Sequence, residues 1–109
     1  MKRTAAIILL LSALTTSVAA QGRCAAEENL RSANGNTTSS IAFFNQTRSP
    51  VNVLWINYEG QRQFYAEIQP GGTWSTQTYV THPWVIEHES GGCLGLYFPE
   101  MSPRDIVIR

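Results

Sequence analysis

The chain has 109 residues, 43% hydrophobic and 15% charged, with eight basic and eight acidic side chains and a formal net charge of +0. This length supports one small domain. Residues 21–109 carry six arginines against eight acidic residues, 6 − 8 = −2, and the arginines are scattered. A nucleic-acid-binding domain would carry a clustered basic patch, so no nucleic-acid partner is expected.

Residues 1–20 have the pattern of a secretory signal peptide. Lys2 and Arg3 give a positive start, residues 7–14 are mostly apolar, and small residues at positions 18–20 suit a signal peptidase. The apolar run is shorter than the ~20 residues that span a bilayer, and no later segment is long enough, so membrane insertion is not expected. We expect a mature protein that begins at Gln21 and is secreted or periplasmic.

Two cysteines, Cys24 and Cys93, lie in the predicted mature chain. In an oxidising compartment an even pair is most simply interpreted as one disulfide, here across 93 − 24 = 69 residues. A reactive thiol or an intermolecular link are the alternatives. Together with His82 and His88 the cysteines lack zinc-finger spacing, so neither a metal nor another cofactor is expected.

Residues 21–40 are polar and rich in small side chains, and predict an irregular or short helical lead-in that Cys24 partly pins. From residue 41 the chain alternates short β-favouring runs with turns rich in Gly, Pro and Ser. Seven strands are predicted, at residues 41–44, 51–58, 62–68, 73–80, 84–88, 94–98 and 105–108. Their spacing of about ten residues favours an all-β domain over residues 41–109, a small antiparallel seven-stranded β-sandwich, which we expect to be a monomer.

The third run alternates as a half-buried strand does. Phe64, Ala66 and Ile68 share one face, which we assign to the interior, and this leaves Tyr65 on the outward face. The second run, residues 51–58, is apolar on both faces and is therefore predicted to be central, with Trp55 either packed inward or lining a pocket. Trp74 is assigned to the core because aromatic side chains bury a large area.

We do not expect an enzyme. For the alternative of an enzyme that acts on a carbohydrate or peptide, only His82 and the scattered carboxylates could serve. The strand-turn-helix context of a G-x-S-x-G nucleophile is absent, and Glu87 and Glu89 flank His88 as residues of a solvated strand face would. An aromatic cluster with interleaved polar residues is more informative, and it favours a binding protein over an enzyme. Its members are Trp55, Tyr65, Thr78, Tyr79, His82 and Trp84.

Several short motifs, in a fixed order and spacing, resemble a known family. They are Leu30-Arg31-Ser32-x-Asn34, Ser49-Pro50, Trp55-Ile56-Asn57-Tyr58-x-Gly60, Tyr65, Pro70-Gly71, Thr78-Tyr79-x-x-His82-x-Trp84 and Leu96-Tyr97-Phe98-Pro99. From about Leu30 to Trp84 without a gap, and again after a shorter loop, the chain resembles the β domain of the von Hippel-Lindau tumour suppressor family.

The resemblance implies a β-sandwich that recognises 4-hydroxyproline in an extended peptide. Three aromatic residues would wall a slot for the pyrrolidine ring, two polar residues would hydrogen-bond its hydroxyl, and two more would contact the peptide. Plain proline would leave the polar pair unsatisfied, at ~1–3 kcal/mol for a buried group. The slot would be walled by Trp55, Tyr65 and Trp84. The hydroxyl would be met by Thr78 and His82, and the peptide would be contacted by Tyr79 and Asn34.

The chain departs from the family pattern at three positions and at its end. The family's serine is Thr78, whose methyl would crowd the slot, while Gln77 replaces a histidine and Asn36 replaces an arginine that contacts the peptide. The chain ends at Arg109, soon after the last predicted strand, so we expect neither the helical domain that binds elongin C nor a ubiquitin-ligase role. The expected partner is an extracellular protein or peptide, for example one that contains hydroxyproline. The alternative is a structural or adhesion β-sandwich with no hydroxyproline selectivity.

Overall fold

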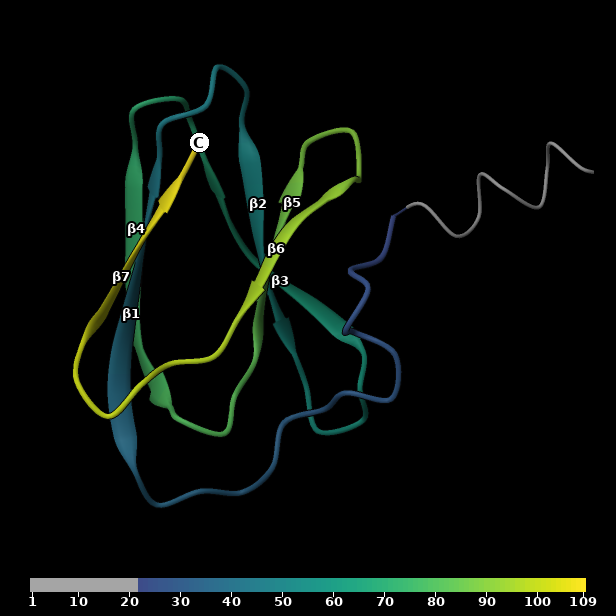
Figure 1. Ribbon diagram of the computed structural model, residues 1–109, viewed down its shortest axis with the longest axis vertical. Helices are drawn as coiled ribbons and strands as arrows, with labels where there is room; N and C mark the ends of the chain where they lie inside the picture. Colours follow the sequence, from purple (N-terminus) through teal and green to yellow (C-terminus); the bar gives the residue numbers. More distant parts are fainter. Residues whose placement is uncertain (1–21) are drawn as a thin grey trace, which may run out of the picture.

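The computed structural model describes residues 22–109, which form two β-sheets packed face to face (Figure 1). One sheet has the strand order β4-β1-β7 and the other β3-β2-β5-β6. The predicted all-β sandwich is therefore confirmed, whereas the predicted signal peptide, residues 1–20, lies outside the described residues. No described residue belongs to a helix that could cross a membrane. The strands are β1 (Thr38–Asn45), β2 (Val51–Ile56), β3 (Arg62–Ile68), β4 (Thr73–Tyr79), β5 (Trp84–His88), β6 (Cys93–Tyr97) and β7 (Arg104–Ile108).

All seven predicted strands are present, and their bounds differ by a few residues. The largest difference is in β1, which begins at Thr38 rather than Ile41, because Thr38 to Ser40 pair with Tyr79 to Gln77 of β4. This places the start of the sandwich inside the predicted lead-in. β2 ends at Ile56, since Asn57 already belongs to the tight turn that leads into β3.

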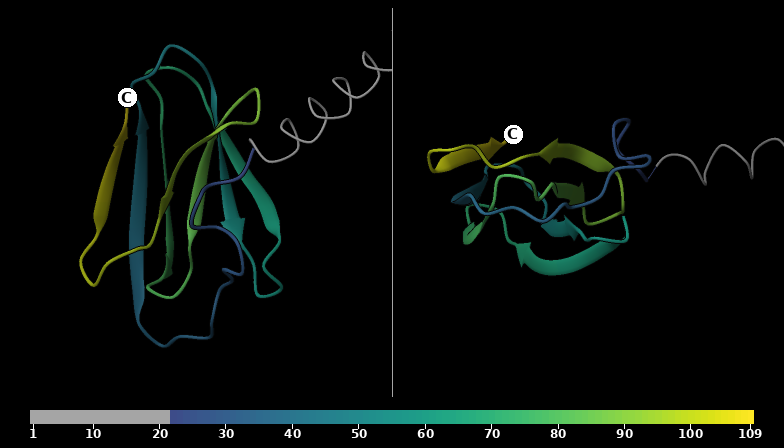
Figure 2. Two further views of the ribbon diagram at one scale, coloured as in Figure 1. Left: turned by 45° about the vertical axis from the view of Figure 1, so that its right-hand side comes forward. Right: turned by 90° about the horizontal axis from the view of Figure 1, so that it is seen from below.

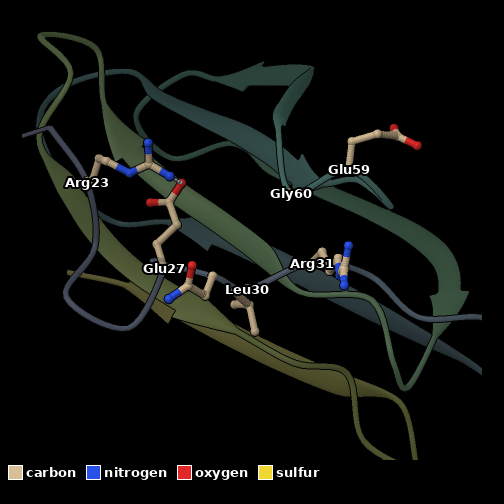
Figure 3. A pocket seen from close by; sticks show the side chains of 7 residues that line it. Arg23, Glu27, Leu30, Arg31, Glu59 and Gly60 are labelled. Carbon is tan, nitrogen blue, oxygen red and sulfur yellow. Dashed lines mark ion pairs between the residues drawn. The ribbon is translucent and has the colours of Figure 1, made fainter.

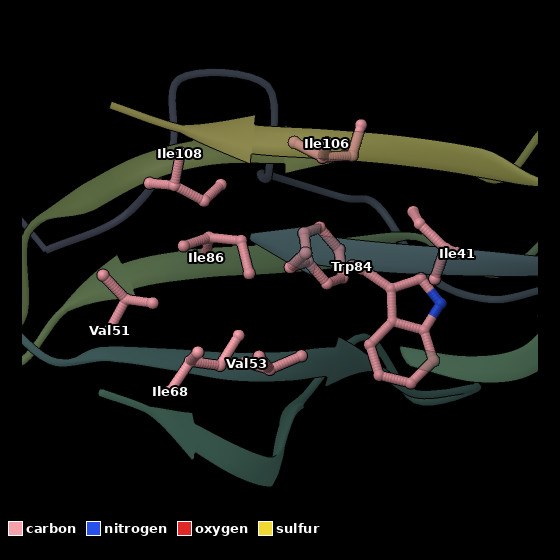
Figure 4. Close-up of a cluster of buried hydrophobic side chains, with 9 residues drawn as sticks. Ile41, Val51, Val53, Ile68, Trp84, Ile86, Ile106 and Ile108 are labelled. Atoms are coloured by element: carbon pink, nitrogen blue, oxygen red, sulfur yellow. The ribbon is translucent and has the colours of Figure 1, made fainter. Parts of the chain in front are cut away.

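The core lies between the two sheets and draws on both of them (Figure 4). Apolar side chains of β1 and β7 in one sheet face those of β2, β3 and β5 in the other. Burial of this apolar surface stabilises the fold, at roughly 25 cal/mol per Å² removed from water. The nine buried members are Ile41, Phe43, Val51, Val53, Ile68, Trp84, Ile86, Ile106 and Ile108, and Trp55, Ala66, Trp74 and Tyr97 pack against them.

One strand pair departs from the predicted antiparallel arrangement. Four pairings are antiparallel, but β7 runs parallel to β1, with Ile106 beside Phe43 (Figure 2). β6 ends in the four-stranded sheet, and the chain then crosses to the other sheet before β7 begins. Because this crossover replaces a hairpin, β7 can enter alongside β1 in the same direction.

A β-bulge in β3 changes the predicted alternation. Val53 pairs with Ala66 and Leu54 pairs with Phe64, so Tyr65 has no partner in β2. The extra residue shifts the side chains before it to the opposite faces. The prediction that Phe64 shares the interior face with Ala66 and Ile68 is therefore wrong, and the Phe64 side chain is exposed. Ala66 and Ile68 do pack in the core, as predicted.

The lead-in is irregular from residue 22 to residue 37 and covers the outer face of the four-stranded sheet. The predicted disulfide between Cys24 and Cys93 ties it to β6. Beneath it lies a second apolar cluster, built from Cys24, Leu54, Ile56 and Val85. β2 is thus covered on both faces, which explains why its sequence lacks a polar side.

A buried ion pair also holds the lead-in. The carboxylate of Glu27 is fully buried and accepts hydrogen bonds from Nε and Nη2 of Arg62, at 2.7 and 2.8 Å. Nη1 of Arg62 donates to Glu87 on β5 at 2.7 Å. Arg62 lowers the pKa of Glu27 through these hydrogen bonds and its charge, against the opposing effect of burial.

Candidate functional site

A cavity of about 220 Å³ opens where the free edges of β3 and β4 face each other. Strands from both sheets contribute to its wall, and His82 enters from the turn between β4 and β5. Six of the seven residues singled out from the sequence line it, although they span 30 positions of the chain. The lining residues are Trp55, Tyr65, Thr76, Gln77, Thr78, Tyr79, His82 and Trp84.

The aromatic part of the wall is a set of rings that meet at steep angles. The centroids of Tyr65 and Trp84 lie 5.0 Å apart with planes at 75°, and those of Trp55 and Tyr65 lie 6.3 Å apart at 87°. Trp74 packs behind them, 5.7 Å from Trp84. Such edge-to-face pairs stabilise one arrangement of the rings beyond their burial. The wall is therefore held in place before any ligand arrives.

The bulge explains how Tyr65 reaches this wall. Strict alternation would aim Tyr65 away from the strand face that carries Ala66. As the unpaired residue of the bulge it instead leans toward Trp84 while its side chain stays 44% exposed. Re-aiming a side chain in this way is a common use of a bulge beside a binding site. For Trp55 the sequence left open whether it packs inward or lines a pocket. In the structure it does both, since it packs against the core and lines the cavity.

Thr78 provides a buried hydroxyl at the cavity wall. Thr78 is 5% exposed, and its Oγ1 accepts a hydrogen bond from Nε1 of Trp84 at 3.2 Å. A hydroxyl has one proton to donate and two lone pairs. The bond from Trp84 uses one lone pair and leaves the Thr78 proton available to a ligand oxygen.

His82 is the second buried polar group of the cavity. It is 7% exposed, and its Nε2 lies 3.0 Å from the hydroxyl of Tyr58. The imidazole is packed against Trp55 and Tyr79, with ring centroids 5.2 Å away in both cases. Burial lowers the pKa of His82, because the charged form loses its hydration. The neutral ring therefore predominates at pH 7.

The cavity wall carries no charged side chain but includes buried hydrogen-bond donors, and this limits the kind of ligand that fits. None of the eight lining residues is an Asp, Glu, Lys or Arg. Nε1 of Trp55 is a buried donor without a hydrogen-bond partner among the described residues. A cavity of this kind suits an uncharged group that is apolar over most of its surface and carries a hydrogen-bonding oxygen.

Asn34 does not line the cavity. It is exposed in the lead-in, between residues that contact the turn carrying His82. The backbone N–H of Ala33 donates to the carbonyl of Thr81 at 3.4 Å, and the Thr81 hydroxyl donates back to the carbonyl of Ala33 at 2.7 Å. Asn34 thus follows a residue bonded to the turn that carries His82, and it is not part of the cavity wall.

Sequence reasoning did not single out two residues of this site. Thr76 lines the cavity two positions before Thr78, and the alternation of a strand gives both the same face. Tyr58 is 42% exposed and does not line the cavity, but its hydroxyl reaches His82. The signal for Tyr58 was its place in the Trp55-Ile56-Asn57-Tyr58 motif, which puts its ring 5.4 Å from that of Trp55.

A second hollow, of about 410 Å³, lies between the lead-in and the turn at Gly60 (Figure 3). Its buried carboxylate, Glu27, is already paired with Arg62, and Arg23 approaches the same carboxylate at 3.7 Å. Arg31 and Glu59 add opposite charges at its rim. Within residues 22–109, no group of three or more His, Cys, Asp or Glu side chains could hold a metal ion.

Comparison with known proteins gives a family match and a structural likeness. The family model described as the VHL beta domain matches residues 30–94, which is more than half of the chain and includes every residue of the cavity wall. A solved structure, titled as an NMR structure of a protein from Eubacterium rectale, is 16% identical, with a TM-score of 0.43 over 69% of this chain and 82% of that chain. The family match therefore carries the assignment, and the chain belongs to the VHL beta domain family.

Proposed function

We propose that this protein is a secreted peptide-binding module that recognises 4-hydroxyproline in an extended segment of an extracellular protein. The β domain of this family is a binding domain rather than a catalytic one. The observation that carries the proposal is the single cavity in which Trp55, Tyr65 and Trp84 meet the buried polar groups of Thr78 and His82. A pyrrolidine ring is compact and mostly apolar, and its 4-hydroxyl is an uncharged oxygen, so 4-hydroxyproline matches both parts of the wall.

The free edge of β4 supports docking of an extended peptide. β4 pairs with β1 on one side only, and its last four residues, 76–79, line the cavity along the other side. An edge strand offers unpaired backbone N–H and C=O groups to another chain. Backbone hydrogen bonds along this edge would supply affinity, and the cavity would supply specificity.

Selectivity for the hydroxyl follows from the buried polar pair. In the bound state a hydroxyl oxygen replaces the water that would otherwise satisfy Thr78 and His82. A plain proline displaces the same water and returns no hydrogen bond, which costs ~1–3 kcal/mol for each buried group that is left unpaired. Discrimination thus comes mainly from the penalty on the wrong ligand.

The test is binding of the purified protein to two labelled peptides that differ only in proline or 4-hydroxyproline, measured by fluorescence anisotropy. We expect the hydroxylated peptide to bind at least tenfold more tightly, which is about 1.4 kcal/mol. His82→Ala should abolish this preference. His88→Ala is the matched control, because His88 bonds to Ser90 in a turn that does not line the cavity.

Two results would refute the proposal. One is equal or absent binding of both peptides by a protein whose circular dichroism shows the folded β-structure. The other is unchanged peptide binding by a folded Trp55→Ala variant. Either result would favour the alternative of a structural or adhesion module.

Export is the part of the proposal that rests on residues 1–20. The basic start, apolar run and small residues at positions 18–20 support it. N-terminal sequencing of the protein recovered outside the cytoplasm is expected to begin at Gln21. Recovery of the full chain from the cytoplasm alone would contradict export and leave the binding test unaffected.

A further inference from the structure

Tyr58 lies outside the cavity wall, yet it makes the one side-chain hydrogen bond that His82 forms with a described residue. We propose that Tyr58 is a positioning residue that fixes the tautomer of His82, so that the imidazole presents Nδ1–H as a hydrogen-bond donor to the ligand oxygen. This inference rests on the proposed function for its effect on ligand selectivity. Its effect on the imidazole itself is independent of any ligand.

The turn that carries Tyr58 is held in place by its own sequence. Oδ1 of Asn57 accepts hydrogen bonds from the backbone N–H groups of Glu59 and Gln61, at 3.0 and 2.9 Å. Gly60 has a φ of 80°, a left-handed conformation that glycine adopts without steric cost, and its N–H donates to the carbonyl of Asn57 at 3.0 Å. The position of Tyr58 is therefore set by the Asn57 and Gly60 positions of the motif.

The rings around His82 leave it little freedom to rotate. Trp55 and Tyr79 pack against it, and Tyr58 meets it edge-on, with centroids 5.4 Å apart and planes at 86°. The backbone N–H of His82 also donates to the carbonyl of Tyr79 at 3.0 Å. With the ring confined, the hydrogen bond at Nε2 decides which nitrogen bears the proton.

The direction of that bond follows from acid strength. A phenol is a stronger acid than a neutral imidazole N–H, and an imidazole nitrogen is a stronger base than a phenol oxygen. The Tyr58 O–H therefore donates to Nε2, and the proton of the neutral ring resides on Nδ1. Nδ1 forms no hydrogen bond with another described residue, so this donor is left for a ligand.

Thr78 completes the pattern. Its hydroxyl already accepts from Trp84, and it retains a proton to donate. A ligand hydroxyl has two lone pairs and one proton, so it can accept from Nδ1–H of His82 while it accepts from or donates to Thr78. An ammonium in the same place could only donate, and it would face the donor on His82. The cavity should therefore bind a 4-aminoproline peptide more weakly than a 4-hydroxyproline peptide.

The experiment compares the wild type with Tyr58→Phe, which keeps the ring that packs on Trp55 and His82 and removes only the hydroxyl. Long-range ¹H–¹⁵N correlation spectra of the free protein at pH 8 report the tautomer of His82. We expect the Nδ1–H form in the wild type and a shift toward the Nε2–H form in Tyr58→Phe. Tyr97→Phe is the matched control, because Tyr97 packs on Phe43 and does not line the cavity.

Peptide binding supplies the second readout. In Tyr58→Phe we expect the preference for 4-hydroxyproline over proline to fall by about two- to tenfold, the range that corresponds to one net hydrogen bond. Affinity for the proline peptide should stay within about twofold, since that peptide does not use Nδ1. A merely structural role of Tyr58 would instead weaken both peptides equally.

The outcomes separate this inference from the proposed function. An unchanged His82 tautomer in Tyr58→Phe, or a changed tautomer with an unchanged peptide preference, would overturn the role of Tyr58 while leaving hydroxyproline recognition intact. A wild type with no peptide preference would overturn the proposed function and with it the role in selectivity. The spectra would then still decide whether Tyr58 sets the tautomer.

Discussion

The indole Nε1–H of Trp84 donates a hydrogen bond to Oγ1 of Thr78 at 3.2 Å, across the two sheets of the sandwich. Both residues are almost fully buried, so no water replaces this bond in the folded protein. The same hydroxyl that anchors the aromatic wall also faces the cavity. The same oxygen atom therefore contributes to the stability of the fold and belongs to the proposed ligand site.

Thr78→Val tests the stabilising part of that relationship. The substitution keeps the shape of the side chain and removes the acceptor, which leaves Nε1 of Trp84 buried and unpaired. We expect the free energy of unfolding to fall by about 1–3 kcal/mol, measured by chemical denaturation. Thr78→Ser retains the acceptor and should lose less than Thr78→Val. Equal losses in the two variants would show that the bond contributes little.

The strands were predictable because each is a local feature of the sequence. Short β-favouring runs separated by turns that contain Gly or Pro define all seven strands, and the two apolar faces of β2 matched its central position between the core and the lead-in. Six of the eight residues of the cavity wall were predictable, because they belong to motifs that resemble the family in order and spacing, such as Thr78-Tyr79-x-x-His82-x-Trp84.

The features that sequence reasoning missed depend on contacts between distant segments. Nothing in residues 62–68 marks Tyr65 as a bulge, because the bulge is a property of the pairing with β2. The parallel entry of β7 depends on the crossover between the sheets. The bond from Tyr58 to His82 joins positions 24 residues apart and needs the turn at Gly60 to bring them together.

Arg62→Met should destabilise the lead-in, because it removes the positive charge that is hydrogen-bonded to the buried Glu27 carboxylate. Removal of Arg62 leaves the buried carboxylate with only the exposed Arg23, 3.7 Å away. We expect a loss of about 3 kcal/mol in the free energy of unfolding, the lower end of the 3–5 kcal/mol range for buried pairs, because Arg62 is partly exposed and Arg23 remains. The double variant Glu27→Gln/Arg62→Met should lose less than the sum of the single variants.

Arg104→Met is the matched control for that cycle. Arg104 approaches Glu100 at 4.0 Å, and the Glu100 side chain is 65% exposed. Exposed pairs contribute about 0–1 kcal/mol, and the hydrogen bond that Nη1 of Arg104 donates to the carbonyl of Phe98 is exposed as well, so this variant should lose clearly less stability than Arg62→Met. Losses of similar size in Arg62→Met and Arg104→Met would contradict the special role of the buried pair.

Loss of the disulfide should remove a large share of the stability. Cys24 and Cys93 are 69 residues apart, and a crosslink over that distance contributes about 4 kcal/mol in the chain-entropy model. We expect Cys24→Ala/Cys93→Ala to reduce the free energy of unfolding by this order. Reductant should destabilise the wild type in the same way and leave the double variant unchanged. A loss below about 1 kcal/mol would show that the lead-in is held by the ion pair and the apolar cluster instead.

Stability is expected to fall on mild acidification because of His82. Burial lowers the pKa of His82 below its usual value of about 6.5. At a pH between the pKa of His82 in the folded protein and about 6.5, its pKa in the unfolded chain, the unfolded chain binds a proton that the folded protein does not. The free energy of unfolding therefore decreases as pH falls through about 6.5 and levels off below the pKa of the folded protein. Above about pH 7.5 both states are neutral at this residue, and its contribution to the slope disappears.

Denaturation of the wild type, His82→Gln and His88→Gln between pH 5 and pH 8 measures this effect, and an NMR titration of the imidazole of His82 gives its pKa directly. His82→Gln should show a shallower dependence on pH than the wild type, because it removes the group that resists protonation. Comparison with His88→Gln, which removes the other histidine of the chain, separates the contribution of His82 from that of the remaining groups. If the free energy of unfolding depended on pH with the same slope in the wild type and in His82→Gln, the cavity would accept a charged imidazole at no cost in stability. In that case acid would leave the cavity intact, because protonation of His82 would cost the fold nothing.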